Sequence, residues 1–299
     1  MAQPFTYGGQ AVIEGVMMRG ERFMAVAVRR PDGVIVAKVE PLGTLAESRW
    51  RRVPLVRGVV VLAEALVLGI RTLQYSAAVA MGRDDERLSR GETALILGTS
   101  LAVAVGVFFL GPAAAVHWAD PEGGAPLIAN TVEGLLRLGL FLGYLALIAR
   151  LPEIRRVFQY HGAEHMTIHA YEHQAPLTEE GVRPFPPEHP RCGTSFLITV
   201  MLLATLVFSL VGQEPLWWRL LSRVVLIPVI AGAAYEVIRL AARREDGLLG
   251  RALAAPGIWL QKITTRQPEA DQIEVALAAF KAVRSADQSA PERAAGEPA

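Results

Sequence analysis

The 299-residue chain has a single cysteine, Cys192, and this scarcity excludes two kinds of site. One cysteine forms no disulfide within the chain, and it cannot build a zinc site from cysteine alone. The formal net charge is +1, so the chain as a whole has no electrostatic attraction to nucleic acid. We therefore expect no nucleic-acid partner, and nothing in the composition indicates an oxidising compartment.

Several common motifs are also missing. The N-terminus lacks the basic stretch and apolar run of a cleaved signal peptide, so we expect membrane insertion to depend on internal segments. The glycine-punctuated stretch from Gly8 to Gly20 has no Gly-Lys-Ser/Thr ending, which excludes a phosphate-binding loop of that type. We find no internal repeat.

Charged residues are also few, and the chain contains long apolar runs. Charged residues make up 20% of the chain and hydrophobic residues 52%. Residues 93–116 form an uncharged apolar stretch, long enough to cross a bilayer core at about 1.5 Å per residue. Three weaker candidate spans follow, at about 131–149, 194–211 and 220–240. The sequence therefore predicts a mainly α membrane protein with about four transmembrane helices.

The distribution of arginine predicts how these spans are oriented. The connection 150–192 contains five arginines, whereas 117–130 contains Asp120 and Glu122 and no lysine or arginine. Basic connections favour the cytoplasmic side. We expect a multi-pass protein of the cytoplasmic membrane with both termini in the cytoplasm. Arg219 and Arg223, near the outer end of the last span, are exceptions to this pattern.

The segment 53–80 is apolar but carries Arg57, Glu64 and Arg71 at helical spacing. This pattern favours a juxtamembrane amphipathic helix, lying on the membrane or packed against the bundle. A re-entrant or fifth spanning helix is the alternative.

The terminal segments predict a small cytosolic α+β portion. Two valine-rich stretches, 23–30 and 34–40, flank Pro31-Asp-Gly33 and indicate a β-hairpin, with a further strand and tight turns in 8–20. Ile273, Leu277 and Phe280 mark one face of a C-terminal helix. The expected segments are a β-rich cytosolic part (1–52), an amphipathic or membrane-associated helix (53–92), two spans (93–149), a cytoplasmic histidine-rich loop (150–193), two further spans (194–240), a C-terminal cytosolic part (241–284) and a disordered tail (285–299).

Histidines gather in one short stretch, and five of the six lie between His161 and His189. Histidines at i and i+4 of a helix present two imidazoles to one point, as in many zinc sites. The pattern His-x-x-Glu-His also places Glu164 as a potential general base. A hydrogen-bonded structural network and an ordinary surface are the alternatives to metal binding. At 100° per residue, four candidate ligands fall within about 80° of one another on a helix: His161, His165, His169 and Glu172.

Three other positions carry candidate chemistry. Cys192, together with His189, lies directly before the third predicted span and is a metal ligand, a nucleophile or a buried helix-capping residue. Glu236, inside the last predicted span, is a metal ligand or a partner of Arg239. Glu14, a charged residue in the glycine-punctuated stretch, is either structural or functional.

Five blocks together resemble the YqhQ-like family of bacterial membrane proteins, a domain of unknown function often labelled a predicted metal-dependent enzyme. They are Gly9–Gly20, Tyr160–His165, His189–Phe196, Glu236–Arg239 and Pro256–Arg266. Met166 departs from the family pattern, which usually has lysine there. The resemblance implies functional roles for Glu14, His161, Glu164, His165, Glu172, His189 and Cys192.

Two functions are consistent with these features. The first is a zinc-dependent hydrolase in which His161 and His165 bind a divalent metal, and Glu164 activates a water molecule. A further ligand would come from His169, Glu172, His189, Cys192 or Glu236. The second is a non-enzymatic factor for membrane-protein assembly, insertion or scaffolding, in which the His/Cys cluster is structural. The bilayer is an expected partner in both, and membrane-protein partners or a homo-oligomer are further expectations.

Overall fold

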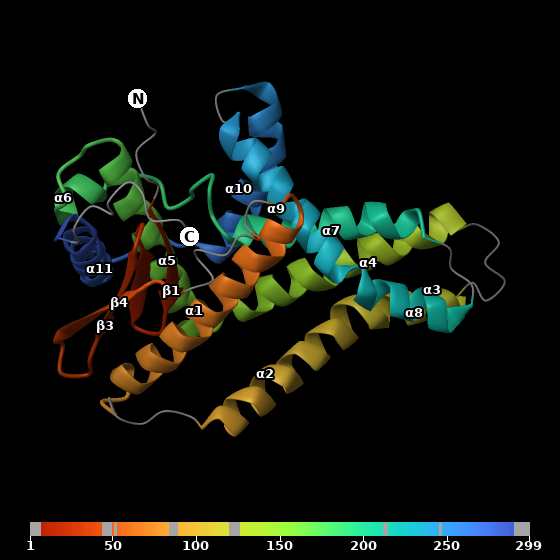
Figure 1. The fold of residues 1–299 in the computed structure, drawn as a ribbon, viewed down its shortest axis with the longest axis horizontal. Coiled ribbons are helices and arrows are strands. Elements are labelled where there is room, and N and C mark those ends of the chain that lie inside the picture. The colour runs from red at the N-terminus through yellow and green to blue at the C-terminus, as the bar shows by residue number, and fades with distance from the viewer. Residues whose placement is uncertain are drawn as a thin grey trace.

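A computed structural model describes residues 7–43, 50, 53–83, 89–119, 126–211, 215–244 and 247–289. Figure 1 shows a small sheet with its covering helices at one end and a bundle of long helices reaching to the other. The sheet is antiparallel, in the order β1 (Gly8–Val12), β2 (Gly15–Arg19), β3 (Phe23–Arg29) and β4 (Ile35–Pro41).

The predicted hairpin is confirmed as β3 and β4, with Phe23 opposite Pro41 and Arg29 opposite Ile35. Gly33 has a positive φ of 87° in the connecting turn, a conformation that glycine adopts without strain. The stretch 8–20 forms two strands where the sequence indicated one, because a two-residue turn brings Val12 opposite Gly15.

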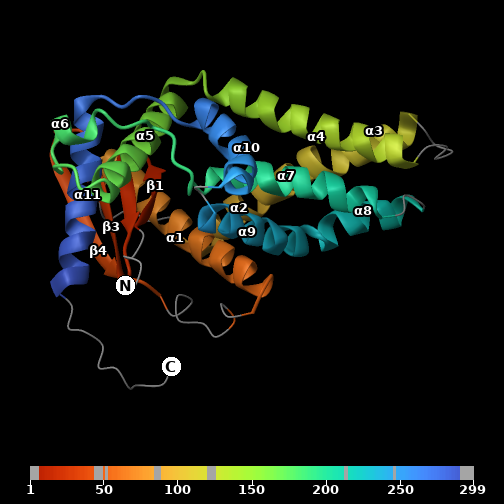
Figure 2. The ribbon, with the colours of Figure 1, turned by 90° about the horizontal axis from the view of Figure 1, so that it is seen from above.

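Helices cover both faces of the sheet, as Figure 2 shows. One face packs against α5 (Pro152–Glu172) and α11 (Ala270–Ser289), and the other against α1 (Val56–Ala80). Ile273, Leu277 and Phe280 are buried, which confirms the predicted face of α11. This helix continues through Ser289, so the expected tail from 285 begins with helix. Residues 290–299 lie outside the described ranges.

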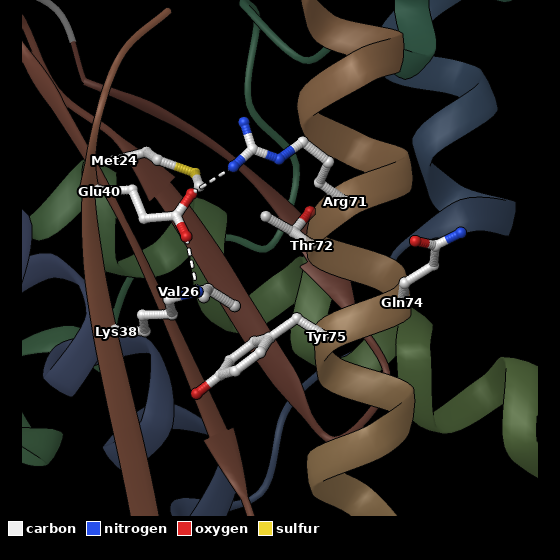
Figure 3. A pocket seen from close by; sticks show the side chains of 8 residues that line it. All are labelled: Met24, Val26, Lys38, Glu40, Arg71, Thr72, Gln74 and Tyr75. Carbon is white, nitrogen blue, oxygen red and sulfur yellow. Dashed lines mark hydrogen bonds and ion pairs between the residues drawn. The ribbon is translucent and has the colours of Figure 1, made fainter. Parts of the chain in front are cut away.

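Two charged residues of α1 form ion pairs with the sheet, while several of its apolar residues are exposed. Glu64 is buried and pairs with Arg19 of β2 at 3.1 Å, while Arg71 pairs with Glu40 of β4 at 2.9 Å. A cavity of about 80 Å³ surrounds the latter pair (Figure 3). Leu66, in contrast, is 55% exposed. Of the alternatives for this segment, the structure therefore shows a helix packed against the folded part.

Among the described residues, two helices are long and apolar enough to cross a membrane. The first, Gly91–Ala119, combines most of α2 (Arg90–Val105), a π-helical segment η3 (Gly106–Leu110) and α3 (Gly111–Ala119). The second, Ile128–Ile148, lies within α4 (Pro126–Ile148). A third candidate is a pair of helices, α8 (Leu216–Val225) and α9 (Ile227–Arg243), which meet at 42°.

The expectation of about four spans is thus reduced to two or three by length and composition. The third predicted span forms α7 (Thr194–Ser209), whose 16 residues are short for a crossing. The fourth is bent because Pro228 lies in the first turn of α9, where a proline begins a new helix. Another helix, α10 (Leu248–Thr264), contains Pro256 in its interior.

A buried ionic cluster joins α4 and α8. Glu133 accepts hydrogen bonds from Arg137 at 2.6 Å, Arg219 at 3.0 Å and Arg223 at 2.9 Å, and all four side chains are at most 1% exposed. Arg219 and Arg223 appeared as exceptions to the arginine distribution. The structure accounts for them, because they lie between helices around a shared carboxylate.

Candidate metal centre

The predicted histidine helix is confirmed as α5. Pro152 occupies its first turn, where the missing N–H costs nothing, and Glu153 complements the positive end of the helix dipole. Apolar side chains of α5, among them Tyr160 and Met166, are buried against the sheet and α11. His161 and His165 lie on a neighbouring face, towards the loop 187–193.

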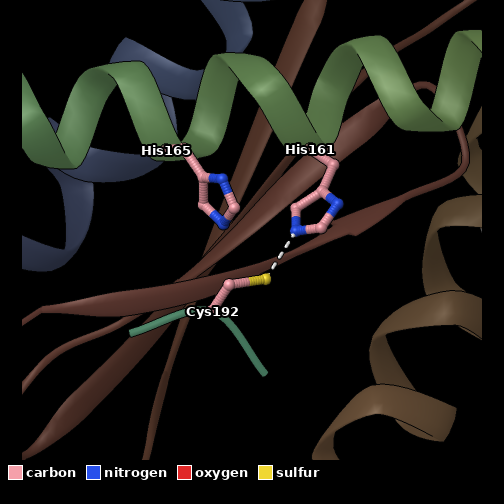
Figure 4. A group of neighbouring side chains, drawn as sticks. All are labelled: His161, His165 and Cys192. Atoms are coloured by element: carbon pink, nitrogen blue, oxygen red, sulfur yellow. Dashed lines mark hydrogen bonds between the residues drawn. The ribbon is translucent and has the colours of Figure 1, made fainter. Parts of the chain in front are cut away.

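His161, His165 and Cys192 form a compact group that can hold a metal ion. Their ligand atoms lie within 4.8 Å of one another, and His165 and Cys192 are buried while His161 is half-buried. The Nε2 atom of His161 is 3.2 Å from the sulfur of Cys192. Figure 4 shows the two imidazoles projecting from α5 towards the thiol, with the strands behind them. Of the alternatives for Cys192, a position beside two histidines favours the ligand role.

Hydrogen bonds behind the two imidazoles define their tautomers. The Nδ1 atom of His161 lies 2.9 Å from the carbonyl oxygen of Thr264, and that of His165 lies 2.6 Å from the carbonyl oxygen of Pro187. A carbonyl only accepts hydrogen bonds, so each Nδ1 carries the proton and donates it. Both Nε2 atoms are therefore unprotonated, and their lone pairs can bind a metal ion beside Cys192. Backbone carbonyls fix zinc-binding histidines in the same way.

Burial sets the protonation of the groups nearest the centre. It lowers the pKa of His165, since a charged imidazolium loses its hydration there, and so favours the neutral form that binds metals. Burial also raises the pKa of Glu164 to about 7, against the smaller opposing effect of His161. The Glu164 carboxylate lies 3.5 Å from Nε2 of His165.

His169, Glu172 and His189 form a second group with ligand-like spacing. The Nδ1 atom of His189 accepts a hydrogen bond from the backbone N–H of Arg191 at 3.2 Å, so its Nε2–H donates to Glu172 at 3.3 Å. Glu172 also binds the guanidinium of Arg191. A metal here would have to displace these bonds, whereas His161, His165 and Cys192 already direct their donor atoms to one point.

The structure places Glu14 and Glu236 away from both groups. Glu14 lies in the β1–β2 turn with a φ of 51° and accepts hydrogen bonds from Arg156 and Tyr160. Glu236 accepts hydrogen bonds from Arg57 and from the backbone N–H of Leu55. The predicted metal role of Glu236 and the predicted catalytic role of Glu14 therefore gain no support from position, because each carboxylate belongs to an ion pair elsewhere.

A cavity of about 550 Å³ opens beside the metal group. His161, Glu164, His165 and Cys192 form one part of its wall, and the other walls include residues of α1, β1, the start of α7 and apolar positions of α5. Its volume is within the range of small-ligand sites in proteins. The group is therefore accessible from a cavity, although its side chains are largely shielded from bulk solvent.

Comparison with known proteins now identifies the family. A family model described as "Protein of unknown function (DUF1385)" matches residues 53–286. The chain belongs to the DUF1385 family. It is 37% identical over 293 residues to the "Uncharacterized protein YqhQ" of Bacillus subtilis (strain 168), covering 93% of this chain and 92% of that relative. No solved structure matches. The resemblance to YqhQ-like proteins is thus confirmed.

Sequence reasoning missed the residues that support the DUF1385 site from behind. Gln261 of α10 is fully buried, accepts a hydrogen bond from the His189 N–H at 2.8 Å and donates to the His189 carbonyl at 3.0 Å. The block 256–266 was part of the family resemblance, so its position was signalled and its role was not. The carbonyls of Thr264 and Pro187 have no side-chain signature that a sequence pattern could show.

Proposed function

We propose that this protein is a membrane-bound zinc-dependent hydrolase with a centre made by His161, His165 and Cys192. The observation that carries the proposal is the shared tautomer of the two histidines, whose Nε2 lone pairs converge beside Cys192 while their Nδ1–H groups are held by carbonyls. Two imidazoles and a thiolate suit zinc. Three protein ligands also leave the fourth position that a catalytic zinc site needs.

Zinc bound by these residues would supply Lewis acidity and make a coordinated water more acidic. Glu164 takes a proton from the attacking water and returns it to the leaving group. In the metal-free protein, burial raises the pKa of this carboxyl to about 7, and a group near neutrality both accepts and donates protons efficiently. Burial in the cavity wall keeps this carboxylate away from bulk water, as the raised pKa requires.

The second group, His169, Glu172 and His189, holds the loop that carries Cys192 against α5. His169 donates from Nε2 to the Glu188 carbonyl at 2.9 Å, and Glu172 holds both His189 and Arg191. These bonds connect α5 to the loop on both sides of His189. The group therefore positions the thiolate, and its own ligand capacity is taken up by hydrogen bonds.

The centre lies on the cytoplasmic side of a multi-pass protein in this proposal. In the described residues, α7 and the bent pair α8–α9 would complete four membrane segments with Gly91–Ala119 and Ile128–Ile148. Both termini would then be cytoplasmic. The arginine-rich connection 150–192, which contains α5, supports this orientation.

Zinc analysis of detergent-purified protein tests the proposal. About one zinc per chain is expected in the wild type, and Cys192→Ser or the double variant His161→Ala, His165→Ala should lose it while still eluting as a folded protein. His173→Ala is the matched control, because this exposed histidine lies outside the centre and should leave the zinc content unchanged. Wild-type protein that binds no zinc after reconstitution would contradict the proposal and favour an assembly or scaffolding factor.

A further inference from the structure

The cavity beside the metal group runs along a free sheet edge. The strand order places β1 at an edge, and within the described residues β1 pairs only with β2. Four consecutive residues of β1 line the cavity: Gly8, Gly9, Gln10 and Ala11. Every second residue of an edge strand directs its backbone N–H and C=O away from the paired neighbour. In β1 these outward N–H and C=O groups point into the cavity.

The two helical layers continue past this edge. Leu62, Leu66 and Gly69 of α1 form one wall of the cavity, and Phe158 and Ile168 of α5 form the opposite wall. The same two helices cover the two faces of the sheet itself. The space between them therefore lies where a fifth strand would lie, about 4.8 Å beyond β1.

The metal group and Glu164 lie beside that position. Glu164 packs so closely against β1 that a Cβ added at Gly9 would be 2.8 Å from its Oε1 atom. Gly9 thus allows the carboxylate to approach the strand backbone. His161 and Cys192 line the same cavity. A backbone paired with β1 would consequently pass next to the proposed general base and the proposed metal ligands.

We propose that the cavity binds a substrate peptide in extended form, as an added strand on the free edge of β1. This inference rests on the proposed hydrolase function and specifies that the hydrolase cleaves peptide bonds. Water adds across an amide bond: its oxygen bonds to the carbonyl carbon, the C–N bond breaks, and Glu164 passes the proton to the departing nitrogen. No oxidant or reductant is needed.

A peptide fits this cavity better than a lipid chain does. An acyl chain would cover the outward N–H and C=O groups of β1 without bonding to them, which is costly. An extended peptide bonds to each of them, as in other cases of strand addition. The cavity walls also determine which side chains of the peptide fit. Leu66 and Phe196 present apolar surface to the cavity, so apolar residues are expected at alternate positions of the substrate.

A binding experiment separates this proposal from the proposed metal chemistry. The probe is a fluorescein-labelled peptide that alternates leucine and serine, and its fluorescence polarisation is measured with the full chain in detergent. A second probe is N-methylated at alternate amides, which removes the donors that an edge strand needs. We expect the methylated peptide to bind at least about tenfold more weakly, since several hydrogen bonds are lost.

Variants locate the bound peptide. Leu66→Trp fills the cavity and should weaken binding of the unmethylated probe by a similar factor. Leu101→Trp is the matched control, because this residue of α2 is 66% exposed and is absent from the cavity wall. Wild-type protein freed of zinc with a chelator should still bind the peptide, since the sheet edge does not depend on metal. Failure of zinc binding and failure of peptide binding are therefore distinguishable.

Cleavage of the bound probe completes the test. Mass spectrometry should find hydrolysed amide bonds with zinc-loaded wild type and none with Glu164→Gln, which keeps the cavity. Equal binding of the methylated and unmethylated peptides, or displacement of the peptide by palmitic acid with no effect of N-methylation, would overturn strand addition. Tight binding without cleavage by the zinc-loaded wild type would overturn the peptidase.

Discussion

The sulfur of Cys192 lies 3.2 Å from Nε2 of His161, although 31 positions separate the two residues in the chain. His161 is in the middle of α5, and Cys192 lies in a loop just before α7. The contact is held from behind by α10, whose Thr264 carbonyl accepts the Nδ1–H of His161 and whose Gln261 anchors the loop at His189. Three separate elements therefore define one group of donor atoms.

Replacing Gln261 tests this support. Gln261→Leu should destabilise the protein by about 1–3 kcal/mol, because the buried N–H and C=O of His189 lose their partners. Zinc affinity should fall by roughly 10–100-fold, as it does when outer hydrogen bonds of metal sites are removed. Thermal unfolding in detergent and a competitive zinc titration measure the two effects. The exposed Gln267→Leu is the control, and equal zinc affinity in both variants would refute the supporting role.

The raised pKa of Glu164 predicts how stability depends on pH. A carboxyl whose pKa rises from 4.5 to about 7 on folding stabilises the folded state fully below 4.5, and this contribution is lost as pH rises through about 7. The shift corresponds to roughly 3 kcal/mol at 1.36 kcal/mol per unit. In metal-free protein, Glu164→Gln should therefore gain stability relative to wild type between about pH 5 and about pH 8.

Thermal unfolding of chelator-treated protein at several pH values measures this difference. The exposed Glu180→Gln serves as the control and should follow the wild type at every pH. A constant difference between Glu164→Gln and wild type across the range would show that Glu164 titrates at its ordinary value in the folded protein. Glu164 would then lack the shifted pKa that we assign to the general base.

Glu133 is expected to be essential for the helical bundle. Glu133→Gln leaves Arg137, Arg219 and Arg223 buried with no carboxylate between them. Removing one partner of a buried ion pair typically costs about 3–5 kcal/mol, so the variant should unfold at a markedly lower temperature or fail to accumulate. Glu269→Gln, at an exposed position, should change stability by about 0.5 kcal/mol or less. Equal melting temperatures for both variants would contradict a structural role for the cluster.

Local patterns predicted local structure well. The histidine periodicity indicated the helix that is now α5, and the valine-rich stretches around Pro31-Asp-Gly33 indicated the β3–β4 hairpin. Both depend on residues close in the chain. The ion pair between Arg57 and Glu236 and the carbonyl of Thr264 behind His161 depend on packing between distant elements. No spacing in the sequence signals such contacts.

The membrane segments show where composition alone is insufficient. Residues 220–240 were predicted as one span, but Pro228 starts a new helix and the two pieces meet at 42°. Arg219 and Arg223 were exceptions to the expected arginine distribution, because their partner Glu133 lies 86 and 90 positions earlier in the chain. An arginine that pairs with a carboxylate on another helix can be buried within the bundle. Hydropathy does not show such pairs, because it scores each residue without its partners.

X-ray absorption at the zinc edge tests the central claim most directly, because it reports the atoms bound to the metal. For zinc-reconstituted wild type, the account predicts one sulfur at about 2.3 Å and two imidazole nitrogens at about 2.0–2.1 Å, with a further light-atom ligand. The sulfur should disappear in Cys192→Ser. A spectrum of bound zinc without sulfur, or with the same ligands in wild type and Cys192→Ser, would contradict the centre formed by His161, His165 and Cys192.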